Sequence, residues 1–241
     1  MRYPTLTLAI AVATIGAATG PQPPAGIDYE VTAVKRTLAL ETADGERQLR
    51  VGDHARSGDL LRTGSRSSAE LAVPERSARF VIGAKTRFHL AHDRPGVLIE
   101  IERGSLRGIF GALPDGDDGE RLVTTPSAVL VVRGTDYGVE VEKDGDTSVA
   151  VFEGTVEVRD SGGLGKAVRV RAGQAVRVRR GKAVGQPSAH GLSSGDWDRG
   201  RRVRAQAPGG AGPPQGMGGP GQRGGGPPAS SPQGGSKRPG G

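Results

Sequence analysis

Apolar and polar residues alternate with a period of two through the middle of the chain. Residues 137–141, 149–151 and 156–158 carry apolar side chains at every second position. This pattern predicts strands that bury one face and expose the other. Gly145 and Gly154 stand between these segments, and glycine can adopt the positive φ that a tight turn needs. The region is therefore predicted to be a series of short strands joined by turns.

Similar segments recur from about residue 28 to residue 180. Strands of about five residues that repeat every ~8–12 residues are typical of all-β folds. No stretch has a long apolar period of 3.6 residues. We therefore predict a single all-β domain of short antiparallel strands, which forms a β-roll or sandwich or a twisted β-helix-like structure. Because aromatic residues make up only 3% of the chain, the core must consist mainly of Val, Leu, Ile and Ala.

Residues 123–160 contain T-P-x-A, then G-T-x-Y-x-V-x-V and then G-x-V-x-V. This order of motifs resembles the core signature of the FecR domain, an extracytoplasmic bacterial module. The resemblance extends upstream to a G-D-x-x-x-T-G motif and covers roughly residues 30–180. We expect a structural role for its signature positions, which are Gly58, Asp59, Thr63, Gly64, Thr125, Pro126, Gly134, Thr135, Tyr137, Gly154, Val156 and Gly173.

The chain departs from the FecR pattern at residues 74–77, where the family commonly has a D-G-S turn. Pro74-Glu75-Arg76-Ser77 is expected to turn with another geometry. The resemblance also implies a compartment. Sigma-regulating members of the family resemble a rod with a cytoplasmic segment, one transmembrane helix and a periplasmic domain.

The first 20 residues have the features of a secretory signal peptide. Arg2 precedes an apolar run from Leu6 to Ala18, and small residues follow. A membrane anchor is the alternative, but the run is shorter than the ~20 residues that a spanning helix needs. We predict export to the periplasm or the medium, and no transmembrane helix in the mature chain.

The C-terminal part of the chain is basic and rich in Gly and Pro. Residues 161–241 contain 14 Lys and Arg but only 2 Asp, whereas the whole chain has a net charge of +7. We predict that residues 181–241 form a disordered tail and that truncation after Ala183 leaves stability unchanged. Four arginines in this tail are candidates for binding a polyanion, namely Arg199, Arg201, Arg202 and Arg204. A solubilising spacer is the simpler alternative. Nucleic acid is not expected, because Trp197 alone offers a stacking surface.

Residues with catalytic or metal-binding chemistry are sparse. The chain has no cysteine and none of the common hydrolase or phosphate-binding motifs, so we predict neither enzymatic activity nor a cofactor. His89, His92 and Asp93 form the tightest cluster of metal-binding residue types, but histidines three apart on a strand point to opposite faces. The acidic segment 115–120 could bind calcium, although it lacks EF-hand spacing. Surface histidines and a solvated turn are the simpler interpretations, and we predict no metal site.

Three functions are compatible with these features. The first is a non-enzymatic, exported FecR-like module that binds an envelope protein or an anionic envelope polymer. The second is an accessory of sigma-factor signalling across the membrane through a separate partner. The third is a hydrolase of an envelope polymer, which requires a carboxylate pair that the sequence cannot place.

Overall fold

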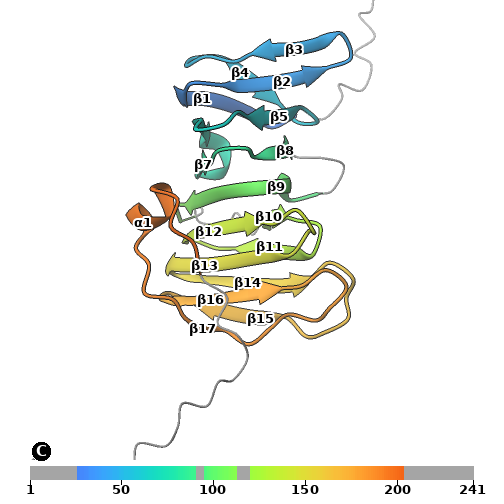
Figure 1. The fold of residues 1–241 in the computed structure, drawn as a ribbon, viewed down its shortest axis with the longest axis vertical. Helices are drawn as coiled ribbons and strands as arrows, with labels where there is room; N and C mark the ends of the chain where they lie inside the picture. The colour runs from blue at the N-terminus through green and yellow to red at the C-terminus, as the bar shows by residue number, and fades with distance from the viewer. Residues whose placement is uncertain (1–25, 91–94, 113–119, 204–241) are drawn as a thin grey trace, which may run out of the picture. The chain divides into compact units, whose positions relative to one another are not determined.

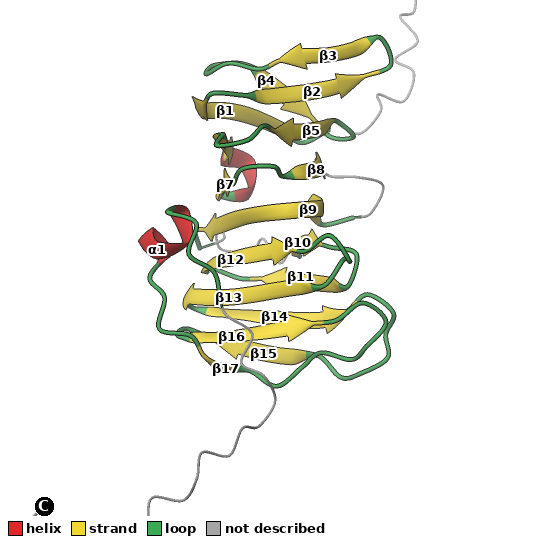
Figure 2. Cartoon of the chain, viewed as in Figure 1, coloured by secondary structure: helices red, strands yellow, loops and turns green. Residues whose placement is uncertain are grey.

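The computed structural model describes residues 26–90, 95–112 and 120–203. These residues form an all-β structure, as the sequence predicted, with strands β1–β17, one turn of 3-10 helix and one short α-helix (Figure 2). The first strand begins at Asp28, where the alternating pattern of the sequence begins. The predicted signal peptide lies outside the described residues.

All the strands belong to one continuous sheet that folds into two layers, and the layers extend from β3 and β4 to β15 and β17 (Figure 1). The order in the first layer is β4 (His54–Arg56), β1 (Asp28–Lys35), β6 (Ser68–Val73), β7 (Ala78–Ile82), the second half of β9 (Val97–Phe110), β12 (Asp136–Val141), β13 (Thr147–Glu153), β16 (Gln174–Val178) and β17 (Ser188–Ala189). The order in the second layer is β3 (Gly45–Gln48), β2 (Leu38–Thr42), β5 (Leu60–Thr63), β8 (Arg87–Leu90), the first half of β9, β10 (Arg121–Thr124), β11 (Ala128–Val132), β14 (Thr155–Asp160) and β15 (Val168–Arg171). This two-layered arrangement agrees with the β-roll or sandwich that the sequence predicted.

Strand β9 joins the two layers. It has 14 residues and passes from the second layer into the first at Gly104, where φ is +99°. A Cβ atom at Gly104 would lie 2.5 Å from the Cα of Thr86, so only glycine fits at this bend. The strand is longer than the sequence led us to expect, and its pairing with β10 is parallel, whereas its neighbours β7, β8 and β12 are antiparallel.

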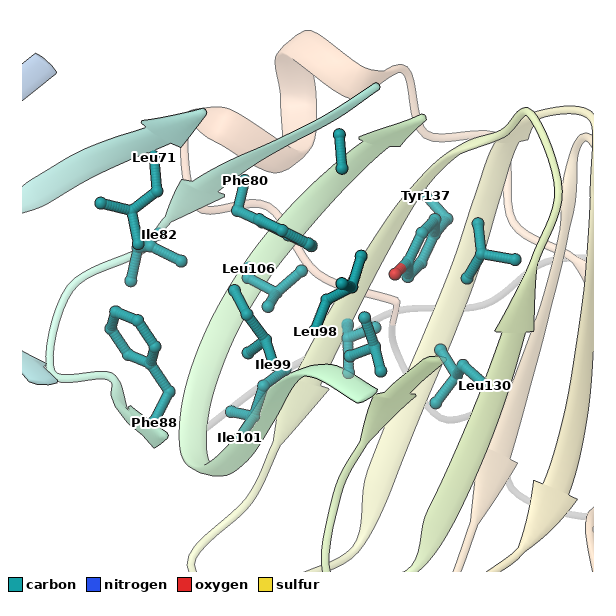
Figure 3. Packing of buried hydrophobic residues seen from close by; sticks show 14 of the residues in the cluster. Leu71, Phe80, Ile82, Phe88, Leu98, Ile99, Ile101, Leu106, Leu130 and Tyr137 are labelled. Carbon is teal, nitrogen blue, oxygen red and sulfur yellow. The ribbon is translucent and has the colours of Figure 1, made fainter. Parts of the chain in front are cut away.

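The core lies between the layers and consists of the alternate apolar side chains of both (Figure 3). Burial follows the period of two, as in β6, where every second residue is buried. Aromatic side chains are few but central, because Phe110 contacts both Phe80 and Tyr137 at centroid distances of 5.5 Å and 5.9 Å. Tyr137 is completely buried.

The turns have the geometry that their residues favour. Gly145 and Gly154 have φ of +88° and +76°, as predicted for the glycines that separate the strands. A Cβ atom at Gly154 would approach the carbonyl oxygen of Gly134 to 2.6 Å. In place of a D-G-S turn, Pro74–Arg76 form one turn of 3-10 helix that ends at Ser77 in the left-handed region.

The predicted boundary between domain and tail at residue 180 is wrong, because the described fold continues to residue 203. β17 pairs with β16, and α1 (Ser194–Asp198) packs beside β9 and β12 (Figure 1). Ser193 caps the helix, since its hydroxyl accepts from the backbone of Asp196 while the Asp196 carboxylate accepts from the backbone of Ser193. Composition concealed this element, because one buried side chain, Trp197, anchors it among Gly, Ser and Arg.

Candidate ligand-binding cleft

Several turns that carry the chain between the layers lie side by side at one end of the strands. We call this the Gly64 end, and the other the Gly154 end. The turns at the Gly64 end are those of residues 36–37 between β1 and β2, 64–67 between β5 and β6, 83–86 between β7 and β8, and the bend of β9 at Gly104. They connect strands that are neighbours in both layers, so they form a row across the end of the sandwich.

Backbone hydrogen bonds connect each turn of this row to the next. The amide of Gly64 donates to the carbonyl of Thr37 at 3.4 Å, and the amide of Lys85 donates to the carbonyl of Gly64 at 3.1 Å. Gly83 donates in turn to the carbonyl of Ser105 at 2.8 Å. The hydroxyl of Thr63 adds a bond of 2.6 Å to the carbonyl of Gly83. Each turn of the row is therefore hydrogen-bonded to the next.

Three of these turns place a basic residue in the left-handed region of the backbone. The values of φ are +70° at Arg36, +56° at Arg66 and +56° at Lys85. All three side chains are exposed. Non-glycine residues adopt such φ values at a cost, and those that do are usually Asn, Asp or His rather than Arg or Lys. The row thus presents three cations from strained positions.

A cleft of about 980 Å³ opens at the Gly64 end, between these turns and the hairpin that joins β12 to β13. Its walls are residues 62–65 and 84–86 on one side, 103–104 at the base of the β9 bend, and 141–144 of the hairpin. The lining therefore contains four basic side chains, Arg62, Lys85, Arg103 and Lys143, and two acidic ones, Glu142 and Asp144.

Ion pairs leave an excess of positive charge in and beside the cleft. Arg62 is paired with Glu46, and Glu142 is paired with Arg177 at 2.9 Å. The carboxylate of Asp144 accepts from the amide of Asp146 within the turn. Five exposed cations at this end have no carboxylate partner among the described residues, namely Arg36, Arg66, Lys85, Arg103 and Lys143. The cleft can therefore accommodate an anionic group.

The signature residues divide between the two ends and the core. Thr63 and Gly64 line the cleft, and Thr125 and Pro126 lie at the same end in the turn before β11. Tyr137 and Val156 are buried in the core. The remaining signature residues lie in turns at the Gly154 end or on their flanks, and they are Gly58, Asp59, Gly134, Thr135, Gly154 and Gly173.

The described arginines that the sequence favoured for polyanion binding, Arg199, Arg201 and Arg202, lie elsewhere, directly after α1. Trp197 of this helix packs against the outer face of the first layer, over Gly138, Ala150 and Ala175. A Cβ atom at Gly138 would lie 2.3 Å from the indole ring. The indole N–H donates to the carbonyl of Leu106 at 3.2 Å, and the indole is 2% exposed. We call the small residues beneath the indole the Trp197 socket.

Arg202 is a packing residue, which corrects its assignment as a polyanion ligand. Its guanidinium stacks 4.4 Å from the centroid of Trp197 and donates to the hydroxyl of Ser105 at 2.7 Å. The Nε atom of Arg202 lies 3.5 Å from the Oε1 atom of Glu140. Burial lowers the pKa of Arg202 and raises the pKa of Glu140, and the attraction between the two opposes both shifts. This stacked guanidinium is only partly exposed, so it offers a polymer little surface.

Arg199 and Arg201 are exposed but paired, because both donate to the carboxylate of Asp196 at 2.9 Å and 2.8 Å. Arg204 lies outside the described residues. The sequence did hold a signal for the cations of the Gly64 end, since a basic residue stands in several successive turns. We missed it because charge density along the chain is higher near residue 200.

The other candidate metal-binding residues are described only in part. His89 lies on β8, and its Nε2 atom is 2.9 Å from the Oε1 atom of Glu102. His92, Asp93 and most of the acidic segment 115–120 lie outside the described residues. Among residues 26–90, 95–112 and 120–203, His, Asp and Glu nowhere form a group of three placed to hold a metal ion.

The motifs that define these turns match a known protein family. The family model of the FecR protein matches residues 59–157. This segment runs from the start of β5 into β14 and supplies every residue that lines the cleft. Arg36 and α1 lie outside it.

Among solved structures, the chain resembles two crystal structures of a candidate anti-sigma factor from Parabacteroides distasonis. The TM-score is 0.44 in both cases, and the sequence identities are 16% and 17%. Each match covers 54% of this chain and 59% of the other, so this chain spans less than two thirds of that relative. No curated protein is significantly similar in sequence. In the part of the chain that the structure describes, no helix has the length and hydrophobicity to cross a bilayer.

Proposed function

We propose that the chain is a non-enzymatic binding module of the bacterial cell envelope that acts in signalling of the sigma-factor type. The match of residues 59–157 to the FecR family carries this proposal. It favours signalling over a freestanding exported binding module, the first of the three functions compatible with the sequence. Export by residues 1–20 remains part of the proposal, because a FecR domain acts outside the cytoplasm.

The cleft at the Gly64 end is the site where the module would receive its ligand. It lies within the FecR domain, it is concave, and hydrogen bonds hold its walls in place. Its two lining carboxylates are engaged, because Glu142 pairs with Arg177 and Asp144 accepts from the amide of Asp146 in its own turn. A hydrolytic carboxylate pair would need groups able to exchange protons with a substrate, so the site favours binding over hydrolysis.

Deletion of the gene in the source bacterium tests the signalling role. We expect a defined set of transcripts under an extracytoplasmic sigma factor to change, and the wild-type gene to restore them. A gene with Leu8→Asp and Ile10→Asp should fail to restore them, because charge in the apolar run blocks export. A transcriptome that does not respond to the deletion under envelope stress would contradict the signalling role. Full activity of the export variant would contradict an extracytoplasmic site.

A further inference from the structure

The basic residues of the Gly64 end form a row with a regular spacing. Arg36, Arg66 and Lys85 belong to consecutive turns, whose strands are neighbours in both layers. Neighbouring strands lie about 4.8 Å apart, so the backbone positions of these residues advance by about one strand spacing per turn. Arg103, beside the β9 bend, occupies the next position, and Lys143, in the hairpin after β12, lines the same cleft. We call these five residues the cation row.

The cation row is costly to the fold in two ways. Three of its members have positive φ, where glycine would be lower in energy. Like charges on adjacent strands also repel each other, and no carboxylate of the described residues pairs with any member of the row. Folding alone does not require basic residues at these positions. A backbone outlier with a charged, unpaired side chain is therefore evidence for a binding role.

The shape and chemistry of the row indicate the kind of ligand. Charges that repeat at a fixed interval along a straight line match a linear polymer that carries one anionic group per repeat. None of the described residues that line the cleft is aromatic, so they offer bases no surface for stacking and do not favour nucleic acid. The lining contains no large apolar side chain other than Val141, which is buried, so insertion into a lipid surface is not favoured either.

We infer that the cation row binds a linear anionic polysaccharide, which lies across the end of the sandwich and enters the cleft between Lys85 and Lys143. Recognition is electrostatic and polar, since the sugar rings find no aromatic platform in the lining. The inference concerns the same cleft as the proposed function and names its ligand class, but binding does not depend on signalling.

The test uses the full-length chain and a triple variant, Arg36→Gln, Arg66→Gly and Lys85→Gly. Glycine removes the side chain at two strained positions without disturbing the turn. The matched control is Arg56→Gln, Arg169→Gln and Arg171→Gln, which removes three exposed cations from β4 and β15, the outermost strands of the two layers. Both variants have the same net charge, so a difference between them reports position rather than total charge.

Binding is measured with polygalacturonate as the anionic polysaccharide, dextran as the neutral one, and polyphosphate, polyglutamate and single-stranded DNA as other polyanions. We expect polygalacturonate to bind to the wild-type chain, more weakly as salt rises. We expect the triple variant to bind roughly tenfold more weakly, and the control to bind within about twofold of the wild type. Dextran should not bind.

Equal losses in the triple variant and the control would overturn the inference, because binding would then depend on total charge. Tighter binding of DNA or polyglutamate than of polygalacturonate would overturn the ligand class. Unfolding transitions of all three proteins verify that the variants are folded, and the glycines should preserve stability. If the triple variant loses polysaccharide binding but still restores the sigma-factor transcripts, the inference stands and the signalling role of the cleft is contradicted. If the triple variant keeps polysaccharide binding but fails to restore the transcripts, the inference alone is overturned.

Discussion

Two basic regions of this molecule differ in what their charges do. Near α1, Arg199 and Arg201 pair with Asp196, and Arg202 stacks on Trp197. At the Gly64 end, Arg36, Arg66 and Lys85 have no such partner among the described residues and stand at positive φ. The first region has the higher density of arginine along the chain, yet its described arginines contact groups of the fold itself. The comparison shows that the partners of a cation, rather than the local charge density, decide whether it is available to a ligand.

The largest effect is expected when the anchor of the first region is removed. Trp197→Ala empties the Trp197 socket and should lower the free energy of unfolding by about 3 kcal/mol. Denaturant unfolding measures the change, with the exposed Arg199→Gln as a control that should cost less than about 0.5 kcal/mol. Truncation after Ala183 should destabilise the domain in the same way, contrary to our expectation from sequence. A truncated chain as stable as the wild type would show that α1 contributes nothing.

A larger side chain beneath the indole should also lower the free energy of unfolding, but by less. Gly138→Val introduces a side chain whose Cβ would lie 2.3 Å from the indole, so Trp197 must move. We expect a loss of roughly 1–3 kcal/mol, as is typical of overpacking. Because the indole would then be more exposed, the fluorescence of Trp197, the single tryptophan of the chain, should shift to longer wavelength. An unchanged spectrum would contradict the close packing.

The opposite sign is expected at the Gly64 end. Arg66→Gly removes a side chain that makes no ion pair in the described structure and relieves a φ of +56°. We expect the domain to become more stable by up to about 1 kcal/mol, less the entropy that glycine adds to the unfolded chain. Arg66→Ala keeps the strain and serves as the control. If the glycine variant is less stable than the alanine variant, the arginine has a structural role.

The smallest effect is a dependence on pH that only the first region should show. Hydrogen bonds from the backbone and hydroxyl of Ser193, and then from Arg201 and Arg199, lower the pKa of Asp196. Its contribution is therefore fully present above the ordinary Asp pKa of about 4, and it is lost as pH falls toward the lowered value. Trp197 fluorescence between pH 6 and pH 2 follows the release of α1. The Trp197 fluorescence of Asp196→Asn should differ from that of the wild type at neutral pH, where the wild-type carboxylate is charged. The two should become similar at low pH, where that carboxylate is protonated.

The period of two in the sequence correctly predicted strands, buried faces and the glycine turns, because each of these depends on local geometry. It could not assign strands to layers, since alternation identifies the buried face but not the neighbouring strand. The bend of β9 was also hidden, because Gly104 within an alternating segment is equally compatible with a turn between two strands. At the level of fold class, the all-β sandwich was nevertheless among the architectures predicted.

The candidate cleft was largely out of reach of the sequence. Its lining comes from turns up to about 80 residues apart, such as those of Arg62 and Lys143, and only pairing across β9 brings them together. The socket for Trp197 was hidden for a different reason. Composition averages over many residues and therefore indicated a disordered segment. The packing of a single indole on Gly138 is nevertheless enough to hold the polar residues around it in the fold.

The position of β9 has a consequence for how the domain unfolds. Its first half pairs with β8 and β10 and its second half with β7 and β12, so it carries ladders from both the preceding and the following strands. If the strands before β9 or the strands after β9 separate from it, one edge of β9 loses its hydrogen bonds, and the ladder on its other edge becomes exposed to water. The described strands should therefore melt in one cooperative transition, and the amides of β9 should be the slowest among them to exchange with deuterium.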